Sequence, residues 1–528
     1  MQLITFLGFT ILVAIISYIK SKKTNEATSD GYFLGGRSLT GVVIAGSLLL
    51  TNLSTEQIVG LNGAAFKEGI LVMAWEVIAA IAMVVTAVFL LPRYLKGGIT
   101  TIPQFLERRY DKMTKTITSG LFLSGYVVIL LPIVLYSGAL AINSMFDVPE
   151  LLGVSKTTAL WITVWGIGII GSIYAIFGGL KAVAISDTIN AVGLLIGGLL
   201  IPFFGLLAVG DGSISDGIST LMQSHPEKFI AVGSSKSDIP FGTIFTGMLL
   251  VNLFYWGTNQ AIIQRALGAK NLKEGQKGLI FASFIKILGP LIVVLPGVIA
   301  FHMFGDTLVN PDEAYPMLVT RVLPAAWVGF FAAVLFGAIL SSFNSALNSS
   351  VTLFGIDIYK SHFKTDATER ETVRAGKRFG ILLAILSMCI APLIANAPDG
   401  LFGYLQKVNG CYSIPILTII VVGYLTKYVP AIAAKIAILS GAVLYIIYII
   451  LNEIVYKDEG LFPHFLHVMA ILFVFNVLIM LLIGKFNPRK EAYKQHYTKQ
   501  VDITPWKHIN TLGILVCIIV ISIYIYFS

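Results

Sequence analysis

Long apolar runs recur along the whole chain and are separated by short polar segments. A helix needs about 20 apolar residues to cross the hydrocarbon core of a bilayer. On that rule the pattern predicts an all-α polytopic membrane protein with fourteen spanning helices. The predicted spans are residues 2–20, 38–62, 68–92, 116–145, 158–179, 184–208, 241–266, 277–304, 318–355, 375–396, 400–426, 431–452, 464–484 and 508–527.

Polar residues interrupt two of these spans near their centres. The second span carries a polar run from Thr51 to Gln57, and the seventh carries one from Asn252 to Gln260. Transporters often place their binding sites where a spanning helix is broken near the midplane. We therefore predict that both spans are broken helices that help to form a site.

The two interruptions lie five spans apart, so we predict inverted five-helix repeats over residues 38–208 and 241–426, each with a broken first helix. The two halves share no visible identity, and the pairing depends on position alone. Residues 1–37 would add a helix and a loop, and residues 431–528 would add C-terminal helices. The prediction is one integral membrane domain, residues 1–528.

Composition and charge agree with this class. The chain is 56% hydrophobic and 12% charged, whereas a soluble domain is about 25% charged. Basic residues gather in alternate loops, such as residues 485–507, and Arg265 falls at the inner end of the seventh span. The positive-inside rule then puts both termini outside a multi-pass plasma membrane protein. The gathering of basic residues on the inner side explains the net charge of +9. We therefore expect a lipid bilayer as the partner and no nucleic acid.

Two opposite charges, Glu76 and Lys286, lie deep inside apolar spans. A charge at the bilayer centre costs about 2.5–3.5 kcal/mol, so it usually has a partner or a function. Amides and aromatic residues occur in the same regions: Asn52, Gln57, Trp75, Asn252, Tyr255, Trp256 and Gln406. These residues predict a pocket for a polar ligand. The alternative is a structural ion pair that joins two helices.

The ninth span carries a dense run of serine and asparagine from Ser341 to Ser350. Hydroxyl oxygens beside the free carbonyls of a broken helix suit a monovalent cation. The alternative is close helix packing with interhelical hydrogen bonds. Gly166–Gly171 matches a dinucleotide fingerprint but lies inside a span with no preceding strand, so it fails the structural test for that motif. We expect neither an enzyme nor an organic cofactor.

Seven motifs, taken in their order and spacing, resemble the sodium/solute symporter family, and most closely its bacterial sodium/galactose and animal sodium/glucose cotransporters. The motifs are Asp30–Arg37, Leu53–Gln57, Thr101–Tyr110, Ile176–Val183 with Asp187, Tyr255–Gln260, Val294–Gly297 and Asp357–Lys360. The resemblance covers nearly the whole chain. It implies inverted five-helix repeats that work by alternating access, and sodium-coupled import of a hexose such as galactose or glucose.

The resemblance also implies roles for individual residues. Sugar hydroxyls would be held by Asn52, Gln57, Glu76, Asn252, Lys286 and Gln406. Amides, a carboxylate and an ammonium suit hydroxyls that both donate and accept. Tyr255, with Trp256 beside it, would stack on the sugar ring. An outer hydrophobic gate would consist of Leu61, Trp75 and Phe402.

For sodium, the resemblance implies backbone carbonyls at Leu50, Leu53 and Ala338 and the hydroxyls of Ser341 and Ser342. Asp187 matches an acidic residue on the inner sodium path, and with Ser345 it could form a second sodium site. By itself, Asp187 would be a solvated loop residue near the inner membrane edge. One or two sodium ions per sugar stays open.

The chain departs from the bacterial sugar site at two positions, with Trp75 in place of a tyrosine and Ala79 in place of a serine. The exact sugar therefore stays open. Alternatives are a sodium symporter for another polyol, an inositol or a sugar acid such as sialic acid, and a sugar-gated sensor with weak coupled transport. The oligomeric state is not predicted.

Overall fold

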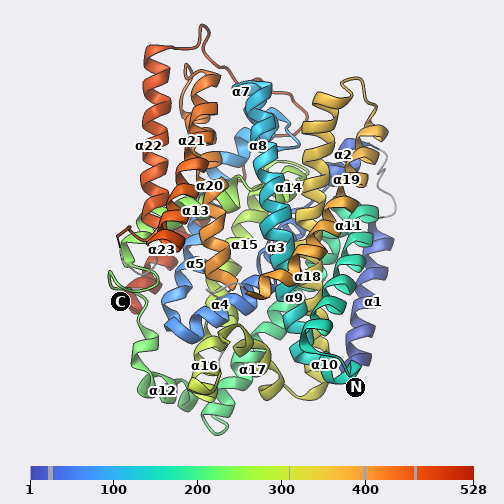
Figure 1. Ribbon diagram of the computed structural model, residues 1–528, viewed down its shortest axis with the longest axis vertical. Coiled ribbons are helices and arrows are strands. Elements are labelled where there is room, and N and C mark those ends of the chain that lie inside the picture. The colour runs from blue at the N-terminus through green and yellow to red at the C-terminus, as the bar shows by residue number, and fades with distance from the viewer. Residues whose placement is uncertain (1, 22–27, 309, 397–400, 457–460) are drawn as a thin grey trace.

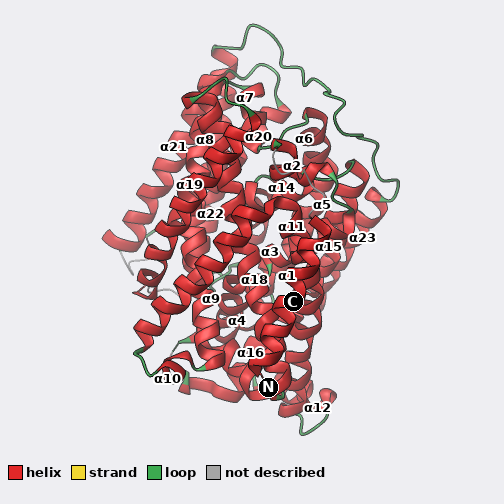
Figure 2. Ribbon diagram, turned by 90° about the vertical axis from the view of Figure 1, so that its right-hand side faces the viewer, coloured by secondary structure: helices red, strands yellow, loops and turns green. Residues whose placement is uncertain are grey.

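The computed structural model describes residues 2–21, 28–308, 310–396, 401–456 and 461–528. These residues form helices and loops in an elongated bundle, and most of the long helices run along its long axis (Figures 1 and 2). An isolated pairing of Leu39 with Ala269 is the one strand-like feature of the described chain. The predicted all-α class is confirmed.

Eleven described helical stretches are long and apolar enough to cross a membrane. Three shorter apolar helices fall in the first, second and seventh predicted spans: Ile4–Ser17, Gly41–Asn52 and Gly247–Gly257. Many large apolar side chains are exposed on these helices, as expected of a surface that faces lipid. The chain is a multi-pass membrane protein, and the number of fourteen crossings stays a prediction.

The helices that position the site and its surroundings are α1 (Gln2–Ser21), α3 (Gly41–Asn52), α4 (Thr55–Glu68), α5 (Ala74–Val85), α7 (Ile102–Arg109), α8 (Lys112–Gly125), α11 (Lys156–Val209), α12 (Ile214–Ser224), α13 (Gly247–Gly257), α14 (Gln260–Leu267), α15 (Leu272–Val293), α17 (Ala314–Val322), α18 (Ala325–Thr352), η9 (Leu353–Phe363), α19 (Glu369–Ile390), α20 (Leu401–Leu425), α21 (Ala431–Ile450), α22 (Phe465–Phe486) and α23 (Ile509–Tyr526). In the view of Figure 1, α3, α15 and α18 occupy the middle of the bundle, with α1 and α22 at opposite edges. α15 packs against both α3 and α5, and α18 packs against α3 and α11.

α11 contains two predicted spans, and its contacts with α18 show that it folds back on itself. Gly171 lies against Leu340, whereas Asn190 lies against Gly337. In a straight helix, Gly171 and Asn190 would be about 28 Å apart along the axis, yet their partners are three residues apart on α18. The halves Lys156–Ala175 and Leu180–Val209 are therefore two antiparallel crossings.

The first predicted break is confirmed. α3 ends at Asn52, α4 begins at Thr55, and Leu53 and Ser54 between them have non-helical backbone angles. Ser54 is nearly extended, with ψ at −179°. Its buried hydroxyl and that of Thr55 make no hydrogen bond to the described protein atoms. The break thus exposes polar groups inside the bundle.

The second predicted break is also confirmed. α13 ends at Gly257 and α14 begins at Gln260. The Asn259 side chain caps α14, because its Oδ1 accepts from the backbone N–H of Ala261 at 3.0 Å and from the Tyr126 hydroxyl at 2.7 Å. Each half of the bundle therefore contains an interrupted helix, while the inverted-repeat relation between them stays a prediction.

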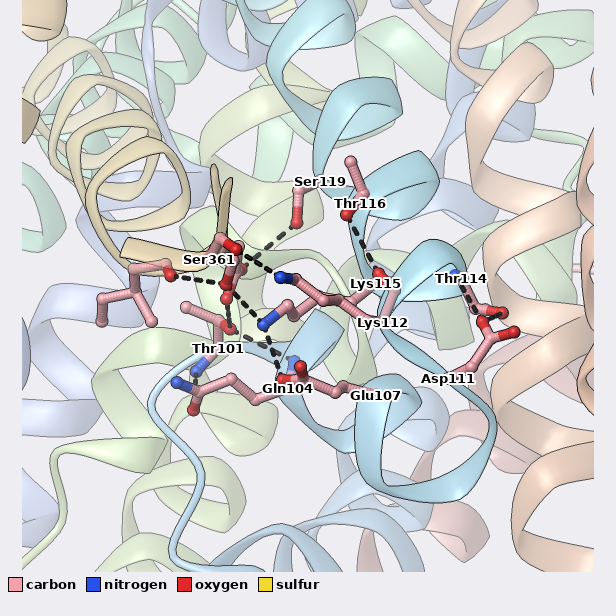
Figure 3. Close-up of polar contacts among 12 residues, drawn as sticks. Thr101, Gln104, Glu107, Asp111, Lys112, Thr114, Lys115, Thr116, Ser119 and Ser361 are labelled. Carbon is pink, nitrogen blue, oxygen red and sulfur yellow. Dashed lines mark hydrogen bonds and ion pairs between the residues drawn. The ribbon is translucent and has the colours of Figure 1, made fainter. Parts of the chain in front are cut away.

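Polar contacts tie α14 to the end of the bundle predicted to face inward. Gln260 Oε1 accepts from the backbone N–H of Ile102, in α7, at 2.9 Å. Lys115 of α8 reaches Glu107 of α7 at 2.6 Å and the Ser361 hydroxyl of η9 at 2.8 Å (Figure 3). These bonds hold α7, α8, α14 and η9 together at this end.

Candidate functional site

A cavity of about 60 Å³ lies between the two broken helices, which is room for a few water molecules. Most of the side chains around it come from α3, α4, α5, α13, α15 and α20. Of the eight side chains predicted to bind a substrate, seven line it: Asn52, Gln57, Asn252, Tyr255, Trp256, Lys286 and Gln406. The eighth, Glu76, joins them through hydrogen bonds.

Glu76 and Lys286 form the centre of this site. Glu76 Oε1 accepts from Lys286 Nζ at 2.5 Å and from Gln57 Nε2 at 2.6 Å. Lys286 Nζ also donates to Asn52 Oδ1 at 2.5 Å. Both charged side chains are at most 1% exposed. The pair therefore reaches the cavity through Lys286 and is bonded to amides on both sides of the first helix break.

The second carboxylate oxygen of Glu76, Oε2, lies close to the backbone of α15. Oε2 makes no hydrogen bond to the described protein atoms. A Cβ placed on Gly289 of α15 would be only 2.2 Å from it. The carboxylate can approach the backbone of α15 this closely because residue 289 has no side chain.

Aromatic residues of α13 form another part of the wall. The rings of Tyr255 and Trp256 meet edge to face at 5.3 Å. Lys286 Nζ lies 5.8 Å from the centre of the Trp256 ring, within range of a cation–π contact. Asn252 donates to the backbone carbonyl of Met248 at 3.0 Å, so its amide is held on its own helix.

A vestibule of about 900 Å³ lies beside the cavity. Its lining includes segments 235–240, 310–312 and 462–465, all from loops or helix ends predicted to lie outside. Trp75 and Gln406 line both spaces. Phe402, which also lines the vestibule, meets Trp75 edge to face at 5.5 Å. An aromatic layer therefore separates the two spaces.

The third predicted gate residue lies elsewhere. Leu61 is fully buried on α4 and is absent from the described lining of both spaces. Contact between α4 and the aromatic layer is made through Gly60, where a Cβ would come within 2.9 Å of Phe402 Cβ.

Oxygen atoms of α3 and α18 gather next to the first break. The Ser342 hydroxyl donates to the Thr51 carbonyl at 2.9 Å. The Thr51 hydroxyl lies 3.3 Å from that of Ser341 and 3.2 Å from that of Ser345. The predicted sodium ligands belong to these same two helices and the break: Leu50, Leu53, Ala338, Ser341 and Ser342. Such an oxygen-rich junction suits Na⁺, which unwound carbonyls coordinate in transporters that have broken helices.

Arg265 is placed differently from the sequence prediction. It was predicted to be a basic residue of an inner loop, whereas its side chain is fully buried on α14. Its Nε donates to the Ser47 hydroxyl at 3.1 Å, and its Nη2 donates to Ser345. Ser47 in turn donates to Asp187 Oδ2 at 2.6 Å. Asp187 is therefore a buried group of the bundle, not a solvated loop residue.

Glu56 was not among the predicted site residues, yet it lines the cavity. Its side chain is buried, and its Oε2 makes no hydrogen bond to the described protein atoms. The signal was present, because both Glu56 and Arg265 are charges within predicted spans, the criterion that singled out Glu76.

Known proteins resemble this chain over most of its length. It is 48% identical over 524 residues to an uncharacterised symporter, YidK of Escherichia coli K12, covering 99% of this chain and 90% of that protein. It is 32% identical over 469 residues to a sodium/glucose cotransporter of Vibrio parahaemolyticus, covering 84% of each.

The fold also matches a solved structure, the substrate-bound, outward-open state of a Na⁺-coupled sialic acid symporter. The TM-score is 0.76 at 21% identity, over 93% of this chain and 98% of the other. At that identity the likeness concerns the fold alone. The family model for sodium:solute symporters matches residues 32–441. This chain belongs to the sodium:solute symporter family.

Proposed function

We propose that this symporter imports a neutral polyhydroxylated substrate, a hexose such as galactose or glucose, together with sodium. The observation that carries the proposal is the bonded set of Asn52, Gln57, Glu76 and Lys286 at the edge of a cavity between two broken helices. A carboxylate, an ammonium and two amides can together donate to and accept from several hydroxyls. An aromatic ring face, supplied by Tyr255 or Trp256, suits the apolar C–H face of a sugar ring.

The charges around the cavity favour a neutral substrate over a sugar acid. Glu56 lines the cavity, and Lys286 is already paired with Glu76. The formal charge of these three side chains is −1, so a substrate carboxylate would meet repulsion in a poorly hydrated space. An inositol, which is also a neutral polyol, fits the same argument and is the second candidate.

Sodium supplies the driving force in this proposal. Bound among the predicted ligands Leu50, Leu53, Ala338, Ser341 and Ser342, it would hold the end of α3 against α18. Asn52 is the last residue of α3, directly after Thr51, which already bonds α18. Sodium would therefore order the amide that bonds Lys286, and its release inward would loosen that contact. A sugar-gated sensor would lack this thermodynamic coupling.

Uptake by purified protein in proteoliposomes tests the proposal. With an imposed inward sodium gradient, labelled galactose should accumulate, and unlabelled glucose or galactose should compete better than sialic acid. Glu76→Gln should abolish accumulation. Glu371→Gln should not, because it breaks an exposed ion pair with Lys364, and neither of these described residues lines the cavity or the vestibule. Equal accumulation with and without the gradient would refute sodium coupling, and competition by sialic acid alone would refute the neutral substrate.

A further inference from the structure

We infer that Arg265 is a tethered cation that occupies the place of a second transported sodium, so that one sodium ion moves with each substrate. The inference rests on the proposed function for its transport consequence. It concerns the group formed by Ser47, Asp187, Arg265 and Ser345, where the sequence left a second sodium site open. The guanidinium lies among the oxygens that such an ion would need.

The contacts of Arg265 use all three of its nitrogen atoms. Nε donates to Ser47 Oγ at 3.1 Å, Nη2 donates to Ser345 Oγ, and Nη1 donates to the carbonyl of Ala261 one turn earlier on α14. The side chain is fully buried. It bridges α14 to α3 and α18, so its position is fixed by three helices.

One of these partners, Ser345, and a group bonded to another, Asp187, are the two side chains that a second sodium site would use. Ser345 was predicted as a ligand and here accepts from the guanidinium. Asp187, the predicted acidic ligand, accepts from Ser47, which also accepts from Arg265. A guanidinium is always charged, has donors only and coordinates no metal. A sodium ion bound to Asp187 and Ser345 would therefore face a positive charge a few ångströms away.

The hydrogen bonds of Arg265 do not use the hydroxyls of the first predicted sodium position, Ser341 and Ser342. Within the described residues, Arg265 donates to Ser47, Ala261 and Ser345 and not to Ser341 or Ser342, and the Ser342 hydroxyl donates to the Thr51 carbonyl at the helix break. Thr51 is the boundary between the two groups, because its hydroxyl lies 3.2 Å from Ser345 and 3.3 Å from Ser341. Arg265 thus occupies the part of the junction that holds Ser47, Asp187 and Ser345, and it leaves the Thr51 carbonyl and the Ser342 hydroxyl to sodium.

The formal charges of the buried side chains also support one bound sodium ion. Five buried ionisable side chains belong to the site around the cavity or to the adjoining oxygen cluster: the acids Glu56, Glu76 and Asp187 and the bases Arg265 and Lys286. Their formal sum is −1. One sodium ion brings this region to neutrality, whereas two would leave a net positive charge in a poorly hydrated interior. A single bound sodium is the balanced state.

Equilibrium binding of ²²Na⁺ to the purified full-length protein tests this inference without any substrate. The wild type should bind about one ion per molecule at saturation, since a second would be repelled by the guanidinium. Arg265→Gln, which keeps hydrogen-bonding capacity but removes the charge, should bind about two. Arg265→Lys should stay near one, and so should Arg378→Gln, which removes an exposed arginine of α19. Two ions on the wild type, or one on a folded Arg265→Gln protein, would overturn the inference.

A flux measurement on the wild type gives a second readout, independent of whether Arg265→Gln folds. In proteoliposomes with a tenfold sodium gradient and no membrane potential, labelled galactose should stop moving at a ratio of about tenfold if one ion is coupled and about hundredfold if two are. A hundredfold ratio would overturn the inference while leaving sodium-coupled sugar transport intact. Binding of one sodium with no galactose flux would instead overturn the proposed substrate and leave the inference standing.

Discussion

Removing one partner of the Glu76–Lys286 pair leaves the other charge buried inside the bundle. Breaking such a pair typically costs about 3–5 kcal/mol of stability, whereas replacing both charges can be nearly neutral. We expect Glu76→Gln and Lys286→Met each to lower the thermal midpoint of the purified protein and to abolish uptake. The double variant should recover most of the stability but none of the uptake.

This comparison separates the two roles that the sequence left open for the pair. If the charges only join α5 to α15, a double variant with restored stability should also transport. Thermal unfolding in detergent and uptake in proteoliposomes, measured on the same four proteins, give both readouts. Restored uptake in the double variant would show that the pair only joins the two helices and does not bind the substrate.

Gly289 tests whether the exact position of the Glu76 carboxylate matters. A methyl group at residue 289 would come within 2.2 Å of Glu76 Oε2, so the carboxylate must move. A misplacement of about 1 Å in a binding group can change rates about a hundredfold. We expect Gly289→Ala to raise the KM for galactose uptake at least about tenfold. Gly120→Ala is the matched control, because that exposed glycine of α8 has open space beside it. An unchanged KM would show that this carboxylate does not hold the substrate.

Helices α5 and α20 carry the two rings that separate the cavity from the vestibule. An edge-to-face aromatic pair contributes about 0.5–1.5 kcal/mol beyond its buried area. We expect Phe402→Ala, which removes the contact with Trp75, to speed release of bound galactose about 2–10-fold. Displacement of labelled galactose from purified protein measures this rate.

Leu61→Ala is the informative comparison for this gate. Leu61 is fully buried on α4 and is not part of the described lining. Its truncation should reduce stability by about 2–5 kcal/mol and leave the release rate unchanged. Faster release from Leu61→Ala than from Phe402→Ala would restore Leu61 as a gate residue.

The sequence predicted the two helix breaks because a run of polar residues is unsuitable for a lipid-facing helix, whether at Leu53–Ser54 or at Thr258–Asn259. It also predicted which side chains meet at the cavity, since their chemistry suits one ligand. It predicted an inner-loop position for Arg265, which the structure buries instead. Under the positive-inside rule, a basic residue near the end of a span is assigned to the loop that follows. The partners that bury it, Ser47 and Ser345, are 218 and 80 residues away, and no local pattern reports such contacts.

At the scale of the whole molecule, the two ends of the bundle differ. The vestibule is lined by segments 235–240 and 310–312, which lie in the connections after α12 and before α17. α12 and α17 lie toward the bottom of Figure 1, where α1 also begins. The residue after α23, Phe527, lies beside the loop that follows α12, because its carbonyl accepts from the Ala231 N–H at 3.0 Å. At the opposite end, the bonds among α7, α8, α14 and η9 hold the helices together. In alternating access, the vestibule end closes when the opposite end opens.

Cysteine labelling tests both the sidedness and the exchange. In a background with Cys389, Cys411 and Cys517 replaced by alanine, Ser235→Cys places a thiol in the vestibule lining, and Asp366→Cys places one on an exposed loop predicted to lie inside. A membrane-impermeant maleimide added to intact cells should label the Ser235→Cys protein but reach the Asp366→Cys protein only after permeabilisation. Sodium with galactose should slow labelling of Ser235→Cys several-fold, because turnover populates states in which the vestibule is closed. Labelling of Asp366→Cys in intact cells would show that the predicted topology is inverted. A labelling rate at residue 235 that does not change with sodium and galactose would show that the vestibule does not close during transport.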